Sequence, residues 1–187
     1  MNKPLIAILF VLMCFSQWYV PGAMIAAEED VLRNGAIFRF RTQPVDPSDP
    51  FRGKYITLSF RDDTFETGDA DKWKLGEEVF VVVEPDEGGF ARIVDLTDVK
   101  PAAGRDYLEV KVSYGSERHV RVDYPFDRFY LEESKAPGAE RAYRDSNRDS
   151  TQVTYAVVRI KDGHSTLEDV MINDRSIVDI VREMNLE

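Results

Sequence analysis

Residues 78–96 read EVFVVVEPDEGGFARIVDL, and this stretch decides the fold class. Two runs rich in β-forming residues, 78–84 and 90–96, flank the Glu-Gly-Gly sequence at 87–89, a combination typical of a β-hairpin. Similar short runs recur from residue 37 onward, separated by Gly, Pro and Asp. We therefore expect a mainly β (α+β) domain built as an antiparallel sheet or barrel of eight or nine strands.

The remaining elements follow from the periodicity of apolar residues. Other β-type runs predict strands at 37–41, 55–60, 107–114, 119–124, 151–161 and 167–172. A short helix is expected over Ala139–Arg148. A second helix is expected over Ser176–Asn185, because Ile177, Ile180, Val181 and Met184 follow helical spacing, and it should cap the sheet.

The N-terminal region differs from the rest of the chain. Between Leu5 and Ala27 it has 23 residues without a charge, enough at about 1.5 Å per residue to cross about 30 Å of hydrocarbon. The helical pattern continues beyond this segment and stops at Gly35, a natural C′ residue. We therefore divide the chain into a membrane-spanning helix with its juxtamembrane extension, 1–34, and an extracytoplasmic β-rich domain, 35–187.

The charges around the apolar segment predict its orientation. Lys3 precedes the span and acidic residues follow it from Glu28, so the positive-inside rule puts the N-terminus in the cytoplasm. A signal peptide cleaved after Ala27 is the alternative, with Pro21-Gly22 opening the cleavage region. A lipoprotein is disfavoured, because the residue before Cys14 is a methionine and the chain after it stays apolar.

The part of the chain after the span is acidic and has no cysteine. Lys3 is the one charged side chain before Glu28, so the remaining 160 residues carry 23 basic and 34 acidic groups, a net charge of −11. Without a basic run, neither nucleic acid nor an anionic lipid surface is expected as the main partner. Cys14 is the only cysteine, so a disulfide and a thiolate zinc site are excluded.

One spacing is that of a calcium loop. Asp145, Asn147 and Asp149 stand at i, i+2 and i+4, as the first ligands of such a loop do. Ser150 and Ala156, however, occupy the positions where the loop needs glycine and glutamate. We therefore interpret these residues as a solvated loop, and we predict no metal and no cofactor.

No residue pattern in the sequence indicates a catalytic residue. Lys54 and Ser59 fall on opposite faces of one predicted strand, so they do not form a serine–lysine dyad. His119 and His164 are the only histidines, too few for a zinc site without carboxylates brought to them by the fold. GxGxxG, P-loop, GxSxG and HExxH sequences do not occur.

Residues 44–60, PVDPSDPFRGKYITLSF, resemble the signature of the bacterial GDYXXLXY family. Its spaced glycine, tyrosine, leucine and aromatic residue correspond to Gly53, Tyr55, Leu58 and Phe60. The chain departs from the signature at Lys54, where the family has Asp, and at Phe60, where it has Tyr. The resemblance extends along most of the chain and implies a single-pass membrane protein without an assigned activity that accompanies a polytopic membrane protein.

Two interpretations of this stretch stay open. Gly53 permits a tight turn, and Leu58 shares one strand face with Phe60, which favours a structural corner. Alternatively, a polar recognition patch is formed by Asp46, Asp49, Arg52 and Tyr55. A second surface candidate is an aromatic patch of Phe126, Phe129 and Tyr130, for which packing in the core is the preferred interpretation.

These observations lead to one expected function and two alternatives. We expect a single-pass protein of the bacterial inner membrane whose outward domain is an accessory that binds a membrane protein. The first alternative is an envelope hydrolase, and the second is a secreted ligand-binding β-domain released by cleavage. The sequence does not indicate an oligomeric state.

Overall fold

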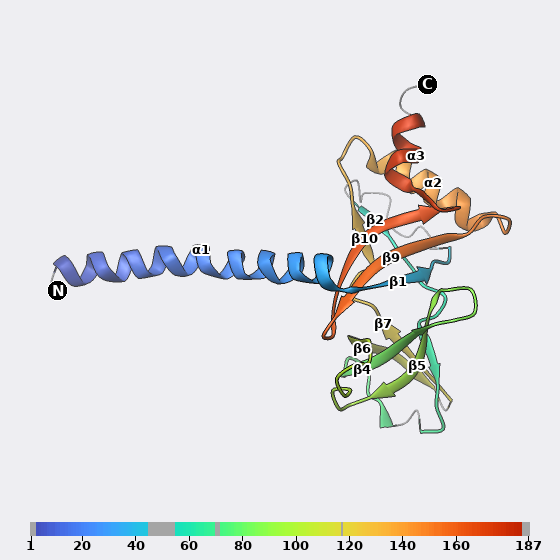
Figure 1. The fold of residues 1–187 in the computed structure, drawn as a ribbon, viewed down its shortest axis with the longest axis horizontal. Helices are drawn as coiled ribbons and strands as arrows, with labels where there is room; N and C mark the ends of the chain where they lie inside the picture. Colours follow the sequence, from blue (N-terminus) through green and yellow to red (C-terminus); the bar gives the residue numbers. More distant parts are fainter. Residues whose placement is uncertain (1–2, 45–54, 70–71, 117, 185–187) are drawn as a thin grey trace.

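The structure, a computed structural model, consists of one long helix that projects from a β-rich domain (Figure 1). It describes residues 3–44, 55–69, 72–116 and 118–184. The helix, α1 (Lys3–Asn34), is long and apolar enough to cross a membrane. From residue 4 to residue 30 its side chains are exposed, apart from the half-buried Cys14, so almost all of the apolar segment packs against nothing in the described chain.

The first sheet is antiparallel, with strand order β1-β9-β10-β11. Its strands are β1 (Ala36–Arg41), β9 (Thr154–Lys161), β10 (His164–Ile172) and β11 (Arg175–Ser176). Both of its tight turns use two successive residues with positive φ: Asp162-Gly163 between β9 and β10, and Asn173-Asp174 between β10 and β11. Such turns match the twist of paired strands, so these short polar residues and the glycine set the register.

The second sheet has the order β3-β7-β6-β4-β5. Its strands are β3 (Thr64–Glu66), β4 (Glu78–Pro85), β5 (Ala91–Thr97), β6 (Tyr107–Ser116) and β7 (His119–Asp123). The outer strands β3 and β5 contact each other, so the sheet is a nearly closed barrel. The predicted β4–β5 hairpin is confirmed: Gly89 has φ +76°, and Asp86 Oδ1 accepts hydrogen bonds from the N–H groups of Gly88 and Phe90.

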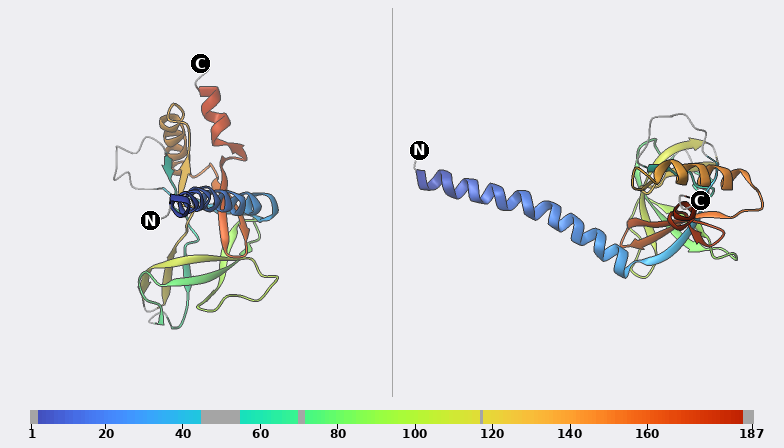
Figure 2. Two further views of the ribbon diagram at one scale, coloured as in Figure 1. Left: turned by 90° about the vertical axis from the view of Figure 1, so that its left-hand side faces the viewer. Right: turned by 90° about the horizontal axis from the view of Figure 1, so that it is seen from above.

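A short ribbon and two helices complete the domain. β2 (Tyr55–Thr57) pairs with β8 (Arg128–Tyr130), and α2 (Ala136–Arg148) packs against α3 (Ile177–Met184) at the end of the domain near β2 (Figures 1 and 2). The two helices come close at Gly138, where an added Cβ would lie 3.1 Å from Val181 Cγ1.

The two sheets and the ribbon share one hydrophobic core. At its centre are four aromatic residues whose ring centroids lie 5.0 to 6.0 Å apart: Phe40, Phe60, Tyr124 and Phe126. Phe40 belongs to β1, Phe60 follows β2, and the other two follow β7. Because these segments are far apart in the chain, the cluster is what joins the sheets into one unit.

The predicted fold class is confirmed, with two departures in detail. The described residues contain eleven strands, more than the eight or nine expected. The additional strands β3, β8 and β11 have two or three residues each, too few for a periodic pattern. The strand predicted over 55–60 ends at Thr57, and Phe60 instead makes an isolated bridge with Thr42. The chain therefore passes from the ribbon to the end of β1 within this segment.

Candidate functional site

The last turn of α1 is part of the β-domain. Lys161 Nζ lies 2.6 Å from Asp30 Oδ2, and Thr166 Oγ1 donates a hydrogen bond of 2.6 Å to Glu28 Oε2. The hydrogen bond from Lys161 lowers the pKa of the Asp30 carboxyl. Val31 is only 5% exposed. These contacts mean that the apolar helix continues into the domain without a flexible linker.

Gly35 allows this junction to be close. Its N–H donates to the Val31 carbonyl at 2.8 Å, and an added Cβ would lie 2.5 Å from the same oxygen and 3.1 Å from the Ile160 backbone. The helix ends just before Gly35, as predicted. Glycine is needed there for close packing and not for a positive φ, so the helix end is fixed by a tertiary contact.

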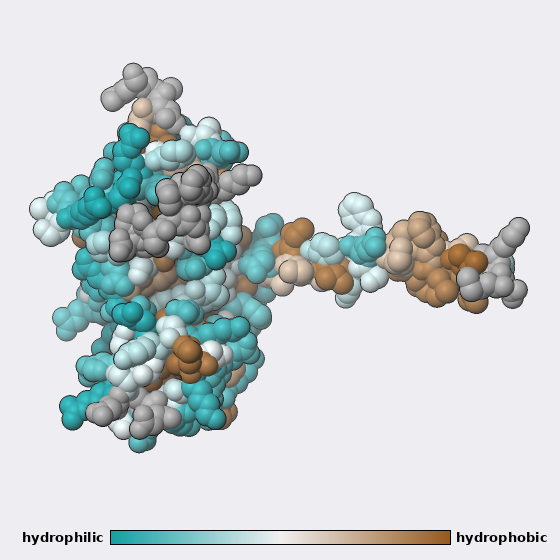
Figure 3. All heavy atoms as spheres, turned by 180° about the vertical axis from the view of Figure 1, so that it is seen from behind, coloured by the Kyte–Doolittle hydropathy of each residue, from teal (hydrophilic) through white to brown (hydrophobic). Residues whose placement is uncertain are grey.

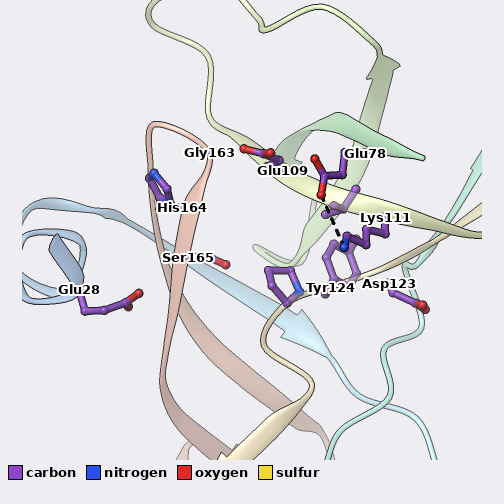
Figure 4. A pocket seen from close by; sticks show the side chains of 11 residues that line it. Glu28, Glu78, Glu109, Lys111, Asp123, Tyr124, Gly163, His164 and Ser165 are labelled. Atoms are coloured by element: carbon purple, nitrogen blue, oxygen red, sulfur yellow. Dashed lines mark ion pairs between the residues drawn. The ribbon is translucent and has the colours of Figure 1, made fainter. Parts of the chain in front are cut away.

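A groove of about 630 Å³ opens beside this junction (Figure 4). One side is the beginning of β10, the other is the middle of β6, and the segment that ends β7 lies between them. Glu28 projects from α1 at the rim (Figure 4). The tip of the β9–β10 hairpin lies on the side of the domain from which α1 projects (Figure 1). The groove is therefore next to the end of the apolar span.

The groove exists because β6 and β10 meet at one point and are not paired with each other beyond it. β6 pairs with β4 over Tyr107–Lys111, but with β7 only over Lys111–Ser116. On its β7 side, the first part of β6 meets the hairpin tip through a parallel bridge between Leu108 and Gly163. The Glu109 N–H donates to the Gly163 carbonyl at 3.1 Å. After this contact β10 and β6 belong to different sheets, and the groove lies between them.

Among the charged side chains that line the groove, carboxylates outnumber cations. Glu28, Glu78, Glu109 and Asp123 contribute negative charges, while Lys111, 3.5 Å from Glu78 Oε1, contributes a positive one. They come from α1, β4, β6 and β7, which only the tertiary structure brings together. Such a surface favours a ligand with cationic N–H donors, because charge-assisted hydrogen bonds to carboxylates are the strong ones.

The hairpin tip adds a hydroxyl and a constraint on the backbone. Ser165 Oγ is buried, has no hydrogen-bond partner among the described residues, and points across the groove in Figure 4. Gly163 has φ +92°, and an added Cβ would lie 2.8 Å from Tyr107 Cε2. Glycine is therefore required at the tip both for its conformation and for space.

The structure divides the signature residues between core and surface. Asp46, Asp49, Arg52 and Gly53 lie outside the described residues, so the polar recognition patch stays a prediction. Leu58 and Phe60 are buried in the core, as the alternation predicted. Tyr55 begins β2 on the other face, opposite Tyr130, with ring centroids 5.4 Å apart and the Arg128 guanidinium 5.3 Å from its ring.

The predicted aromatic patch is also divided. Phe126 is 4% exposed and belongs to the central aromatic cluster, and Phe129 is partly buried against the same core. Tyr130 is 65% exposed, so it shares a surface with Tyr55 and Arg128 and not with the two phenylalanines.

The three residues with the calcium-loop spacing lie in the last turn of α2 and directly after it. Asp145 and Asn147 are in the last turn of α2, where the Asn147 amide accepts from Thr42 Oγ1 and donates to the Tyr143 carbonyl. Asp149 follows the helix, and its carboxylate accepts from the N–H and hydroxyl of Thr151, the hydroxyl bond being the main reason for its lowered pKa. Within the described residues, no three His, Cys, Asp or Glu side chains are placed to hold a metal ion.

The two histidines lie in different parts of the domain. His119 Nε2 lies 3.4 Å from Glu66 Oε1, across the β3–β7 pair, whereas His164 lines the groove. The sequence around His164 does not indicate the groove. The local signal was the Asp-Gly pair at 162–163, which predicts a hairpin but not what the hairpin tip touches.

The comparisons with known proteins give one result. The family model described as GDYXXLXY protein matches residues 17–170, most of the chain. No curated protein and no solved structure matches it. The match includes the second half of the apolar helix, the signature, the groove residues, the second sheet, and the first sheet apart from the end of β10 and β11. The chain therefore belongs to the GDYXXLXY protein family.

Proposed function

We propose that this protein is a single-pass component of the bacterial cytoplasmic membrane that binds a polytopic membrane protein as its accessory. Its N-terminus lies inside and its β-domain outside the cytoplasm. The apolar α1 supports an anchoring role, and Lys3 before the span with Glu28 after it supports this orientation. The domain contributes binding and not catalysis.

The observation that carries the proposal is the direct continuation of α1 into the side of the groove. Glu28 is bonded to Thr166, and Asp30 to Lys161, so the groove stays at the end of the span. A partner in the same membrane therefore meets a groove whose distance from the membrane and whose orientation are already restricted. Less translational and rotational freedom is lost on binding, so a specific complex can form without a large contact area.

The charge of the groove indicates the chemistry of the bound segment. Glu28, Glu109 and Asp123 attract lysine or arginine side chains of an outward loop. The same charges repel nucleic acid and anionic lipid headgroups. We therefore propose a cationic extracytoplasmic loop of the partner as the segment that occupies the groove.

Photo-crosslinking from the groove tests this function. A photoreactive amino acid replaces Glu109 or His164 in the full-length protein, and native membranes are irradiated. Both positions should join the chain to one membrane protein, while the exposed Val99, which is not part of the groove, should not. Equal products from all three positions, or none from the groove, would contradict the proposal.

A charge reversal separates binding in the groove from general attraction. Glu109→Lys should reduce the partner recovered with the protein by roughly tenfold. The matched control is Glu140→Lys, an exposed acidic position on α2, which should have little effect. Turnover of an envelope polymer by the purified protein would instead favour the hydrolase, and a mature chain beginning at Glu28 would favour the secreted domain.

A further inference from the structure

α1 carries a polar residue in the middle of its apolar span. Gln17 follows Ser16, the midpoint of the uncharged stretch 5–27. In Figure 3 the hydrophobic surface of the helix is interrupted partway along by hydrophilic and neutral residues. With a rise of about 1.5 Å per residue, Gln17 lies within about 2 Å of the centre of that stretch.

The side chain of Gln17 has no partner in the described chain. It is exposed, and no described residue bonds to it. A glutamine amide has two N–H donors and an acceptor oxygen, and hydrocarbon satisfies none of them. Ser16 differs, because a serine hydroxyl can donate to the carbonyl four residues earlier in its own helix. The unmet hydrogen bonds are therefore those of Gln17.

Pro21 adds a second unsatisfied group at the same depth. It lies inside α1, four residues after Gln17. Proline has no N–H, so the main-chain carbonyl of Gln17 loses the donor that a regular helix supplies. In membrane proteins, neighbouring helices commonly satisfy the groups that a proline frees. Side-chain amide and carbonyl together make Gln17 a two-part hydrogen-bonding site.

The Gln17 side of α1 leads to the groove. Phe10, Gln17, Met24 and Val31 recur every seven residues, so they form one stripe that drifts by only about 20° per repeat. At its outer end Val31 is buried against the domain, and Glu28, eleven residues after Gln17, lines the groove (Figure 4). A helix that packs along this stripe would leave the membrane next to the groove.

We propose that a transmembrane helix of the partner packs against this stripe and bonds to Gln17 through a hydroxyl, amide or imidazole side chain at the same depth. The inference rests on the proposed function, because the helix and the groove segment belong to one protein. The adaptable side chains of Met13 and Met24 beside Gln17 provide apolar contact. A second copy fits less well, since pairing along the side where Val31 meets the domain would bring together two chains whose residues 28–187 each carry a net charge of −11.

Crosslinking from α1 tests the position of the helix. A photoreactive amino acid is placed at Met13 or Met24 on the Gln17 side, and at Phe15 or Tyr19 on the opposite side, always in the full-length protein in native membranes. The first pair should yield the same partner as the groove positions. The second pair should yield at least fivefold less of it.

A substitution at Gln17 tests the hydrogen bonds. Gln17→Leu keeps the span apolar and should reduce the recovered partner by roughly three- to tenfold, the range expected for interhelical hydrogen bonds in membranes. Ser16→Ala is the matched control and should leave recovery unchanged. The thermal unfolding midpoint of the domain should stay the same in both variants, because neither side chain touches the domain.

The outcomes distinguish the two proposals. If the groove positions give a partner but Met13 and Met24 do not, or if Gln17→Leu has no effect, the helix contact is wrong and the proposed function stands. If neither region gives a partner, both are wrong. A product with twice the mass of the chain from Met13 or Met24 would mean that a second copy occupies the stripe, which also overturns the inference.

Discussion

The β2–β8 ribbon and the groove beside α1 differ in what they present to a partner. The ribbon presents the exposed Tyr130 and Arg128 and the half-buried Tyr55 near α2. The groove presents carboxylates next to the apolar helix. The ribbon includes part of the family signature, whereas the groove is built from residues outside it. The residues that identify the family are thus different from those that form the candidate binding site.

This difference changes how the signature is interpreted. Leu58 and Phe60 are buried, and Phe60 is part of the aromatic cluster that joins the sheets. A motif that supplies core residues is required for folding, whatever the protein binds. Recognition by the signature would depend on Tyr55 and on residues outside the described chain, whereas Leu58 and Phe60 are part of the core.

The largest effect is expected inside the signature. Phe60→Ala should lower the free energy of unfolding by about 3–5 kcal/mol, because it removes a buried ring from the cluster. Tyr130→Ala, on the exposed ribbon, should cost less than about 1 kcal/mol. Urea unfolding of the full-length protein in detergent, followed by circular dichroism, measures both. Equal losses would show that the ribbon is as important for stability as the core.

A smaller effect is expected at the tip of the β9–β10 hairpin, beside the groove. Gly163→Ala and Gly89→Ala both force alanine into a left-handed conformation, which costs about 1–2 kcal/mol. At Gly163 the new methyl group also meets the Tyr107 ring, whereas nothing lies within 4 Å at Gly89, so Gly163→Ala should cost about 1–3 kcal/mol more. The Glu109 amide, bonded to Gly163, should also exchange its hydrogen faster. Equal effects would mean that the hairpin tip is not docked as described.

The smallest effect is expected at the junction, and it depends on pH. The hydrogen bond from Lys161 lowers the pKa of Asp30 in the folded protein, so the native state binds this proton less tightly than the unfolded state does. The stabilisation is therefore complete above the ordinary value of 3.8 and is lost as the pH falls through the lower folded pKa.

Asp30→Asn should therefore destabilise the protein slightly at pH 7, and not at all at a pH below the folded pKa of Asp30. The comparison of its unfolding with that of the natural protein across pH measures this. Glu29→Gln is the control, because Glu29 pairs with Arg33 on α1 itself and not with the domain. A difference between Asp30→Asn and the natural protein that persists at low pH would contradict the role of the Lys161 contact.

Most elements of the fold could be predicted from local patterns. The continuous apolar run at 79–83 in β4 is typical of a buried strand, and the Asp-Gly pair at 162–163 marks a tight turn. β3, β8 and β11 could not be predicted, because strands of two or three residues exist only where a neighbour pairs with them. The groove could not be predicted either. Its carboxylates look like any other charges on an acidic domain.

The sequence by itself determined that an apolar helix precedes an acidic, mainly β domain and that the chain carries the GDYXXLXY signature. These are properties of composition, periodicity and turn residues, which act over a few neighbouring positions. Only the tertiary structure decided that Gly163 meets Leu108, that Lys161 holds Asp30, and that Glu28 borders a groove at the end of the span. Those contacts join distant segments, so they depend on how the sheets and the helix pack together and not on any local pattern.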